Sequence, residues 1–192
     1  MPAKKSLAML LSSILMLGST QLMAAPSASM LADTCAGCHG TDGSSIGPAI
    51  PNIAGLSAEY FNTVMQEYAE DDRHSTIMGR IARGYTKEEI AAMADHFAGL
   101  QYKSTNQKLD AKKVAMGGDL YKKNCGKCHD EMGALADDDA GILASQWLPY
   151  LQYSMEDFQA DKRAMPKKMK KKVSKLSADE IDALLQFFAS QK

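Results

Sequence analysis

The chain has 192 residues, of which 45% are hydrophobic and 23% are charged, and its formal net charge at pH 7 is −1. Its 22 basic and 23 acidic residues leave no excess of positive charge, which excludes the strongly basic surface typical of nucleic-acid binding. The length is compatible with one or two domains. Four cysteines are present, and their positions are the most informative feature.

The amino terminus is typical of a secretory signal peptide. Lys4 and Lys5 precede a short apolar run at residues 7–17, and small residues follow as far as Ala25. A basic start, a short apolar core and a small-residue exit are the parts of such a peptide. The run is short for a membrane span, which disfavours the alternative of a retained anchor. We expect cleavage near Ala24 or Ala25 and no membrane span in the mature chain.

All four cysteines fall in two C-x-x-C-H motifs, at residues 35–39 and 125–129. This is the attachment pattern of c-type haem. Two thiols bond to the two vinyl groups of one haem, and the adjacent imidazole binds the iron as its proximal ligand. A lone C-x-x-C could be half a zinc site or a redox pair, but two complete motifs leave no thiol for a disulfide. The sequence predicts two covalent haems, on Cys35 and Cys38 with His39 and on Cys125 and Cys128 with His129. Because such haems are attached outside the bacterial cytoplasm, the expected location is the periplasm.

The two halves of the chain repeat one pattern. Capping boxes of the form S/T-x-x-E lie at residues 86–89 and 177–180, and each opens a predicted helix. A methionine lies eight residues before each box, 39 or 40 residues after the motif histidine. Both boxes precede an apolar stripe at i, i+3, i+4 and i+7. These stripes are Ile90, Met93, Ala94 and Phe97 in the first half and Ile181, Leu184, Leu185 and Phe188 in the second. The matched features indicate a duplicated domain.

Further helices are predicted in each half. Apolar residues at helical spacing after Ser57 predict a middle helix, and residues 147–158 match it in the second half. Short helices are expected to lead into the motifs from about residue 29 and about residue 118. Residues 103–108 are polar and read as a linker, and no period-2 run indicates a strand. The prediction is an all-α chain with a signal peptide at 1–25 and domains at 26–103 and 104–192, each wrapped around one haem.

Methionines are the candidates for the distal iron ligands. A thioether raises the reduction potential of a haem iron, which suits an electron carrier. Most of the methionines are expected to fill the core, but Met78 lies outside a helical stripe, in a predicted loop before the capped helix. In the second half, alignment of the capping boxes without a gap places Met169 on Met78 and leaves Met165 four residues early. We therefore predict Met78 and Met169 as ligands, with Met165 as the alternative.

Two other histidines are conceivable ligands but are not favoured. His96 lies off the apolar stripe of its helix, and we expect it at the surface or at the edge of the core. His74 lies four residues before Met78, but the second half has no histidine at the equivalent position.

The loop after the first motif contains two prolines within residues 46–51. We expect this loop to offer a backbone carbonyl to the free ring nitrogen of His39, which would fix the orientation of the ring. The second half lacks the proline pair and has three consecutive aspartates at 137–139, so its loop must be built differently.

The two halves differ in charge. Residues 26–103 have a balance of −5, and residues 104–192 have a balance of +2. Much of the positive charge surrounds Met169. Beside an iron ligand, such a charged face would steer an acidic partner towards the haem. The basic residues concerned are Lys167, Lys168, Lys170, Lys171, Lys172 and Lys175.

Over its mature length the chain resembles the diheme cytochrome c subunit of flavocytochrome c sulfide dehydrogenase, which is related to the tandem diheme class I cytochromes c. Residues 40–43, Gly-Thr-Asp-Gly, are common to many class I cytochromes c. The more specific similarity is in residues 75–85 and 142–153, with residues 165–169 beyond them. This resemblance implies two tandem class I cytochrome c domains.

The resemblance also implies a division of labour. A separate FAD-containing flavoprotein subunit would oxidise sulfide and pass electrons to this chain, which would relay them through its haems to a soluble cytochrome c acceptor. The chain has no G-x-G-x-x-G flavin fingerprint of its own. No catalytic residue is therefore expected here, and FAD is expected only on the partner of the heterodimer.

Two alternatives remain. The first is a free diheme carrier that donates to a terminal oxidase. The second is a haem peroxidase, which needs an iron with an open position. A methionine candidate in both halves disfavours the peroxidase.

Overall fold

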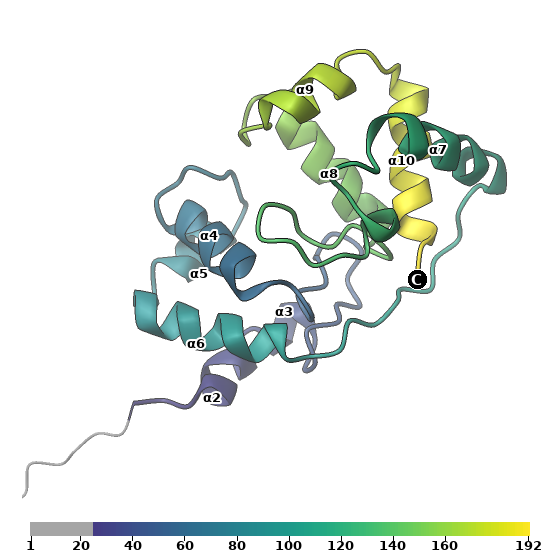
Figure 1. Ribbon diagram of the computed structural model, residues 1–192. Coiled ribbons are helices and arrows are strands. Elements are labelled where there is room, and N and C mark those ends of the chain that lie inside the picture. Colours follow the sequence, from purple (N-terminus) through teal and green to yellow (C-terminus); the bar gives the residue numbers. More distant parts are fainter. Residues whose placement is uncertain (1–24) are drawn as a thin grey trace, which may run out of the picture.

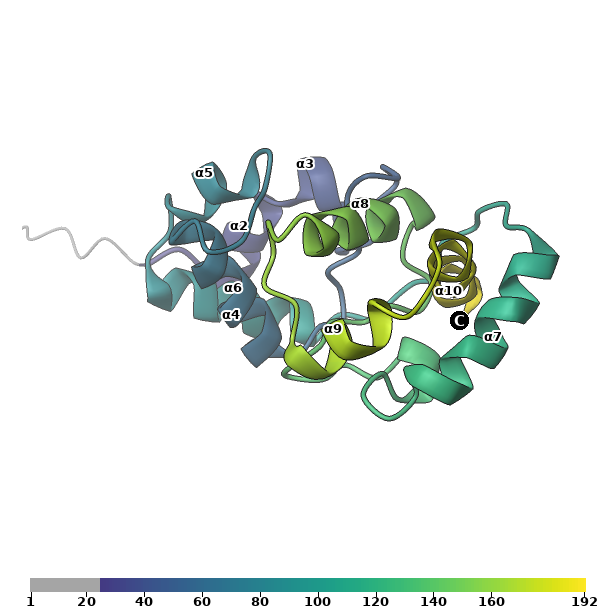
Figure 2. The ribbon, with the colours of Figure 1, turned by 90° about the horizontal axis from the view of Figure 1, so that it is seen from above.

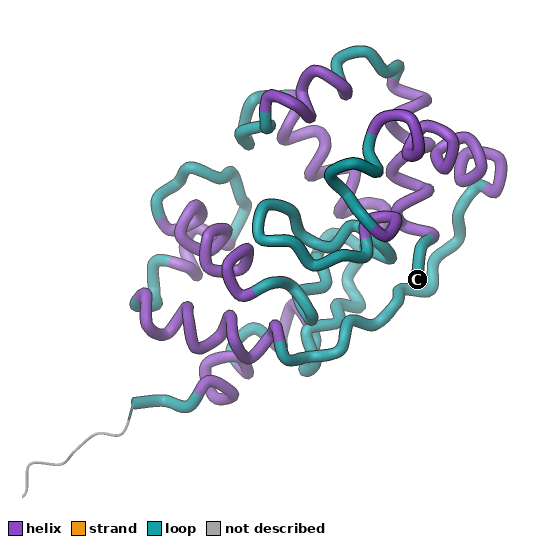
Figure 3. Tube along the Cα trace, in the orientation of Figure 1, coloured by secondary structure: helices purple, strands orange, loops and turns teal. Residues whose placement is uncertain are grey.

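The computed structural model describes residues 25–192, and within this range it contains helices, turns and loops but no strand (Figures 1 and 3). The helices form two lobes. The first lobe contains α2 (Ala28–Asp33), α3 (Ala36–His39), α4 (Ala58–Ala69), α5 (Met78–Ala82) and α6 (Lys87–Ala98). The second contains α7 (Ala111–Asn124), the 3-10 helix η1 (Glu131–Gly133), α8 (Leu148–Gln159), α9 (Lys167–Val173) and α10 (Ala178–Ser190). The predicted all-α fold is confirmed, and the predicted signal peptide falls mainly on residues 1–24, outside the described range.

Helix starts in the first lobe follow from side-chain caps. The Ser57 hydroxyl accepts a hydrogen bond from the Tyr60 amide at the start of α4. Thr86 and Glu89 form the predicted capping box of α6, each side chain bonding to the other residue's backbone amide. The predicted apolar stripe of α6 is buried and packs with Phe61 and Met65 of α4. The core of the first lobe is therefore built mainly on α2, α4 and α6.

In the second lobe, α7 crosses α10 at close range (Figure 2). A Cβ atom added to Gly117 would lie only 2.1 Å from the carbonyl oxygen of Ala183, so the crossing depends on a glycine at this position. The helix α7 begins at Ala111, capped by Asp110, and not near residue 118 as the sequence suggested. The two consecutive glycines hide the helical pattern, because glycine disfavours helix in isolation. The Ser177–Glu180 capping box is confirmed.

The two lobes share a buried interface. The amide of Asn52 donates to the side-chain oxygen of Gln146, and the side-chain amide of Gln146 donates back to the Asn52 carbonyl, both at 2.9 Å. Both residues are almost fully buried. Trp147 donates its indole N–H to the carbonyl of Ser45 at 2.8 Å. Ile142 and Ala144 of the second lobe belong to the core cluster of the first. Paired buried amides fix one relative position of the lobes, because an unpaired one would be costly.

The connection between the lobes is irregular, as predicted, and it is held in place at both ends. Residues 101–110 have no regular structure. The Tyr102 hydroxyl donates to the Ala144 carbonyl at 2.6 Å, and Thr105 donates from its amide to the Ser145 hydroxyl and from its hydroxyl to the Ser145 carbonyl. The boundary between residues 103 and 104 stays a prediction. In residues 25–192, no helix has the length and apolar character needed to span a bilayer.

Candidate haem sites

Both C-x-x-C-H motifs form the same tight turn. The amides of Cys38 and His39 donate to the Cys35 carbonyl at 3.2 and 2.9 Å. The equivalent bonds to the Cys125 carbonyl, from Cys128 and His129, are 3.1 and 3.0 Å long. The turn places two thiols and one imidazole on a single short segment. This is the donor set that covalent attachment of one haem requires.

The proximal histidine of the first lobe is held by a backbone carbonyl. The Nδ1 atom of His39 lies 2.9 Å from the carbonyl oxygen of Pro51, which confirms the predicted role of the proline loop. A carbonyl only accepts, so Nδ1 carries the proton and Nε2 keeps a free lone pair for a metal. The ring is buried, and burial lowers the pKa of His39 although the bond to Pro51 opposes this effect. The imidazole is therefore neutral and ready to bind iron.

The proximal histidine of the second lobe has a different environment. His129 is half-buried, and its ring has no hydrogen-bond partner among residues 25–192. Instead, its ring packs edge to face against Phe188 with centroids 5.9 Å apart. The Tyr121 hydroxyl donates to the His129 carbonyl at 2.8 Å and accepts from the Met132 amide. Burial again lowers the pKa of His129, partly offset by Asp137. The loop here is indeed built differently.

The loops that follow the two motifs nevertheless close in the same way. In the first lobe, the Gly43 carbonyl accepts from the amides of Ile53 and Ala54. In the second, the Gly133 carbonyl accepts from the next loop's amides at residues 143 and 144. Both glycines have positive φ, 74° and 86°, which favours glycine at this position. The repeat seen in the sequence therefore extends to the backbone around each site.

The cysteines fit haem attachment better than a bare metal site. Burial raises the pKa of Cys35 and of Cys125, so both remain thiols at neutral pH. Their motif partners, Cys38 and Cys128, are exposed. Across residues 25–192, no three His, Cys, Asp or Glu side chains converge to hold an ion directly. This disfavours the zinc alternative.

The two favoured methionine candidates lie on short helices and not in loops. Met78 is the first residue of α5, and Met169 is the third residue of α9. The prediction that Met78 lies in a loop is therefore wrong. The sequence does not reveal α5 because its five residues are too few to show a helical pattern. Both side chains are half-buried, and Met78 packs against the core of the first lobe. Met165 lies in the loop before α9 and lines a cavity with Phe158 and Val173. Ligation by Met78 and Met169 stays a prediction.

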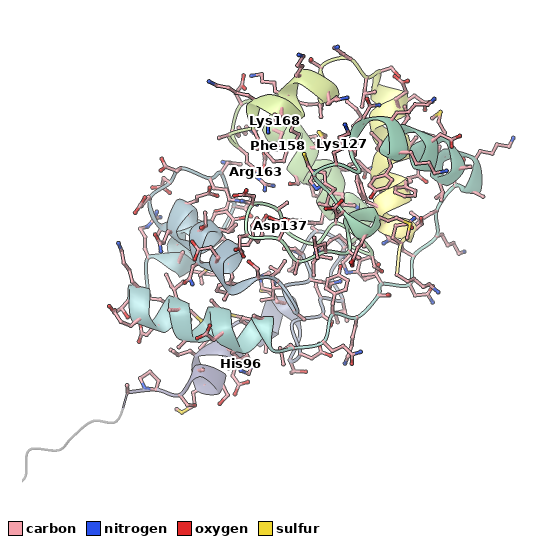
Figure 4. All side chains as sticks on the ribbon, viewed as in Figure 1. His96, Lys127, Asp137, Phe158, Arg163 and Lys168 are labelled. Carbon is pink, nitrogen blue, oxygen red and sulfur yellow. The ribbon has the colours of Figure 1, made fainter. Side chains whose placement is uncertain are left out.

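Neither of the remaining histidines is placed like a buried ligand. His74 is exposed, and its backbone amide donates to the carbonyl of Lys162 at 3.3 Å. His96 is half-buried on α6, edge to face with Phe97, and Figure 4 shows it on the outer side of the first lobe.

The structure also brings together residues that the sequence did not single out. Arg73 and Arg163, 90 residues apart, lie where the two lobes meet, near Tyr60 and Tyr150. The only sign of this pairing in the sequence is that each arginine lies equally far along the chain from the haem motif of its own half. That spacing indicates a shared site only once the two lobes are seen side by side.

The lysines around Met169 form an exposed face on and after α9, here called the lysine face: Lys167, Lys168, Lys170, Lys171, Lys172 and Lys175. Among residues 25–192, only Lys170 of this group has a carboxylate within 4 Å, that of Asp161. Most of the positive charge is therefore not neutralised within the chain.

Comparison with family models assigns both halves. The model described as cytochrome c matches residues 24–101, and the model described as cytochrome c oxidase, cbb3-type, subunit III matches residues 112–188. Each match contains one C-x-x-C-H motif, so each half attaches one haem covalently through its cysteine pair. The chain therefore carries two covalent haems.

Three similar proteins define the relationship further. The cytochrome subunit of sulfide dehydrogenase from Chlorobaculum tepidum is 48% identical over 75 residues, which are 39% of this chain and 67% of that protein. Cytochrome c4 of Pseudomonas aeruginosa is 27% identical over 168 residues, covering 81% of this chain and 83% of the relative. The crystal structure of reduced cytochrome c4 from Pseudomonas stutzeri superposes with a TM-score of 0.76 and 20% identity, covering 86% of this chain and 97% of that one.

The matches agree with the geometry of the two sites. The crystal structure of cytochrome c4 supports the fold, while the sequence relatives carry the family relationship. With a haem motif in each lobe and no strand in the described part of the chain, the protein belongs to the cytochrome c family, as a diheme cytochrome c of two cytochrome c domains similar to cytochrome c4.

Proposed function

We propose that this chain is the diheme electron-transfer subunit of a sulfide-oxidising flavocytochrome c in the periplasm. It accepts electrons from an FAD-containing flavoprotein subunit, with which it forms a heterodimer, and delivers them to a soluble cytochrome c. The observation that carries this proposal is the 48% identity to the cytochrome subunit of sulfide dehydrogenase over 75 residues. The chain itself supplies no catalytic residue for sulfide.

The axial ligands proposed for the two irons are His39 with Met78 and His129 with Met169. Bound haem supplies one-electron transfer, and a thioether opposite an imidazole favours the ferrous state. The neutral imidazole of His39, with its proton on Nδ1, supports the first pair. In the second lobe, the support for Met169 is its position in the repeat, because it precedes the Ser177 capping box by the same number of residues as Met78 precedes Thr86.

The first lobe is the proposed docking side for the flavoprotein. Ile46, which is 91% exposed, follows the first haem motif, and Ile77, 46% exposed, directly precedes Met78. Exposed aliphatic side chains in the segments that carry His39 and Met78 are suited to contact with a permanent partner. Their exposure in the isolated chain supports this assignment.

The lysine face is the proposed docking side for the acceptor. It lies on the second lobe, away from the first iron site, and its charge is largely unneutralised within the chain. Opposite charge on a soluble acceptor would speed their encounter. Electrons would therefore enter through the first lobe and leave through the second.

Coexpression with a flavoprotein encoded beside this chain tests the proposal. We expect a stable heterodimer whose haems become reduced when sulfide is added, with the ferrous absorption bands as the measurement. A chain that purifies alone, and whose haems stay ferric with sulfide and flavoprotein present, contradicts the proposal.

The second candidate function is a free diheme carrier that donates to a terminal oxidase. The observation that favours it is the match to cytochrome c4, which spans 81% of this chain. A free carrier would exchange electrons with an oxidase at full rate without any flavoprotein, which distinguishes the two candidates.

A further inference from the structure

The loop of residues 45–52, between α3 and α4, carries the carbonyl that orients His39. The carbonyl of Pro51, near the end of this loop, accepts the hydrogen bond from Nδ1 of His39 at 2.9 Å. The amide of Ser45 donates to the side-chain oxygen of Asn52 at 2.8 Å, which ties the two ends of the loop together. Ser45 and Asn52 are both buried. Buried contacts therefore decide where this carbonyl lies.

Two consecutive residues of the second lobe hold both ends of this loop. Trp147 donates its indole N–H to the Ser45 carbonyl at 2.8 Å. Gln146 accepts from the amide of Asn52 and donates to the Asn52 carbonyl, both at 2.9 Å. Figures 1 and 2 show the loop between α3 and α4 beside the start of α8, where these two residues lie. The position of the loop therefore depends on the second lobe.

One peptide group connects Gln146 with the ring of His39. The carbonyl of Pro51 and the amide of Asn52 belong to the same planar group, so they cannot rotate independently. The carbonyl accepts from His39, and the N–H donates to the side-chain oxygen of Gln146. Hydrogen bonds in series polarise one another, so an acceptor on the N–H makes the carbonyl a stronger acceptor. Gln146 is thus one peptide group away from a histidine of the other lobe.

The duplication shows that this arrangement is one-sided. A shift of 90 residues superposes the two haem motifs and places Ile142 on Asn52 and Gln146 on Leu56. The two apolar counterparts, Ile142 and Leu56, lie in one buried cluster. In agreement, the ring of His129 has no hydrogen-bond partner among residues 25–192. The polar pair therefore occurs at the interface position that serves the hydrogen-bonded histidine.

A held turn directs Gln146 towards the first lobe. Ser145, directly before it, has φ 56°, a left-handed conformation that is costly for a residue other than glycine. Its counterpart in the first half is Gly55, with φ 71°. The hydroxyl of Ser145 accepts from the Thr105 amide at 2.7 Å, and its carbonyl accepts from the Thr105 hydroxyl at 2.8 Å. These bonds keep Ser145 in the conformation from which Gln146 reaches the loop.

We propose that Gln146 is a positioning residue for the first iron site, and that Trp147 supports it by holding the start of the loop. Through the shared peptide group, Gln146 strengthens the bond between His39 and the Pro51 carbonyl. A stronger bond on Nδ1 makes the imidazole a better electron donor, which favours ferric iron. Contact with the second lobe therefore lowers the reduction potential of the first haem. The inference rests on ligation of the first iron by His39 and not on the sulfide-linked role.

The test compares Gln146→Leu, which installs the side chain of the counterpart position, with Trp147→Phe in the purified diheme protein. One readout is the proton NMR signal of His39 Nδ1–H and its exchange with solvent. The other is the midpoint potential of each haem. We expect Gln146→Leu to speed this exchange and to raise the reduction equilibrium constant of the first haem about tenfold, or about 59 mV for a one-electron couple. Trp147→Phe should act in the same direction but less, and the second haem should not change.

Ser57→Ala is the matched control, because it removes another hydrogen bond between the lobes, to Asp138 at 2.7 Å, and leaves residues 45–52 untouched. It also removes the cap of α4, so it should lower the thermal midpoint without moving the potential or the His39 signal. A purely structural role for Gln146 would give this same result in Gln146→Leu.

If Gln146→Leu does not fold, Trp147→Phe decides the outcome, because it keeps an aromatic ring at a half-buried position. An unchanged His39 signal and an unchanged first potential in the variant that folds overturn the inference alone. If the unmodified protein shows no iron-shifted signal from His39, ligation by His39 is wrong and the inference falls with it.

Discussion

The two proximal histidines occupy equivalent turns, yet within residues 25–192 only one of them has a hydrogen-bonded ring. His39 donates to the Pro51 carbonyl, whereas the ring of His129 is held by packing against Phe188. Both loops close on a glycine carbonyl, at Gly43 and at Gly133, so the difference arises inside loops of equal span. A duplicated domain therefore keeps the attachment turn while the surroundings of each iron diverge.

This divergence has a consequence for the two reduction potentials. A hydrogen bond from Nδ1 makes an imidazole a stronger donor to iron and lowers the potential. The charge balance acts in the same direction, with −5 for residues 26–103 and +2 for residues 104–192, because nearby cations favour the reduced state. We expect the haem of the first lobe to have the lower potential. Electrons would then run from the first lobe to the second.

Removal of one cysteine pair should have the largest effect on this comparison. Cys125→Ala with Cys128→Ala removes both thioether bonds of the second haem, so the haem-to-protein ratio should fall from about two to about one. The reciprocal pair, Cys35→Ala with Cys38→Ala, should leave only the second haem. Mass spectrometry of the exported protein measures both. Loss of both haems from either variant would mean that neither lobe attaches its haem independently. That result would contradict two separate attachment turns.

Loss of a distal ligand should come next. Met78→Ala and Met169→Ala should each remove about half of the ferric iron–sulfur absorption band near the red end and lower the potential of one haem, because a soft ligand is lost. Met132→Ala, at a 49% exposed position in η1, is the matched control and should leave the band intact. If Met165→Ala removes half of the band while Met169→Ala does not, the second iron is bound by Met165.

A substitution at the crossing of α7 and α10 should have a smaller effect, and it should change only the free energy of unfolding. Gly117→Ala should cost about 1–3 kcal/mol, because the added methyl would meet the Ala183 carbonyl and force α7 away from α10. Gly118→Ala, at the next residue of the same helix, meets only the edge of the Phe187 ring at 3.3 Å and should cost clearly less. Urea unfolding of the diheme protein measures the loss in free energy of unfolding for both variants. Equal losses would show that the close approach at Gly117 does not add to the cost of the substitution.

Substitutions on the lysine face should have the smallest effect. Lys168→Gln with Lys171→Gln should slow reduction of an acidic acceptor roughly threefold to tenfold at low salt, since surface charge acts mainly on the encounter rate. The effect should vanish as ionic strength rises. Lys87→Gln, an exposed change in the first lobe, is the control. If the rate of acceptor reduction by the unmodified protein does not depend on ionic strength, this face is not the acceptor's docking site.

Local patterns determined much of this protein. The two haem motifs, both capping boxes and the buried stripes of α6 and α10 could be read from the sequence, since each depends on contacts within a few residues. The carbonyl offered to His39 was also expected, because two prolines restrict the loop that follows the motif. Short elements were harder, and α5 was missed because five residues show no period.

Tertiary structure alone decided how the halves meet. The Asn52–Gln146 amide pair, the approach of Arg163 to Tyr60 and the close passage at Gly117 join residues tens of positions apart in the chain. A sequence records such partners only as separate polar or small residues, because neither periodicity nor capping extends beyond a few turns. Burial then decides which of these residues must pair, since an unpaired polar group inside an interface costs more than the bond it would form.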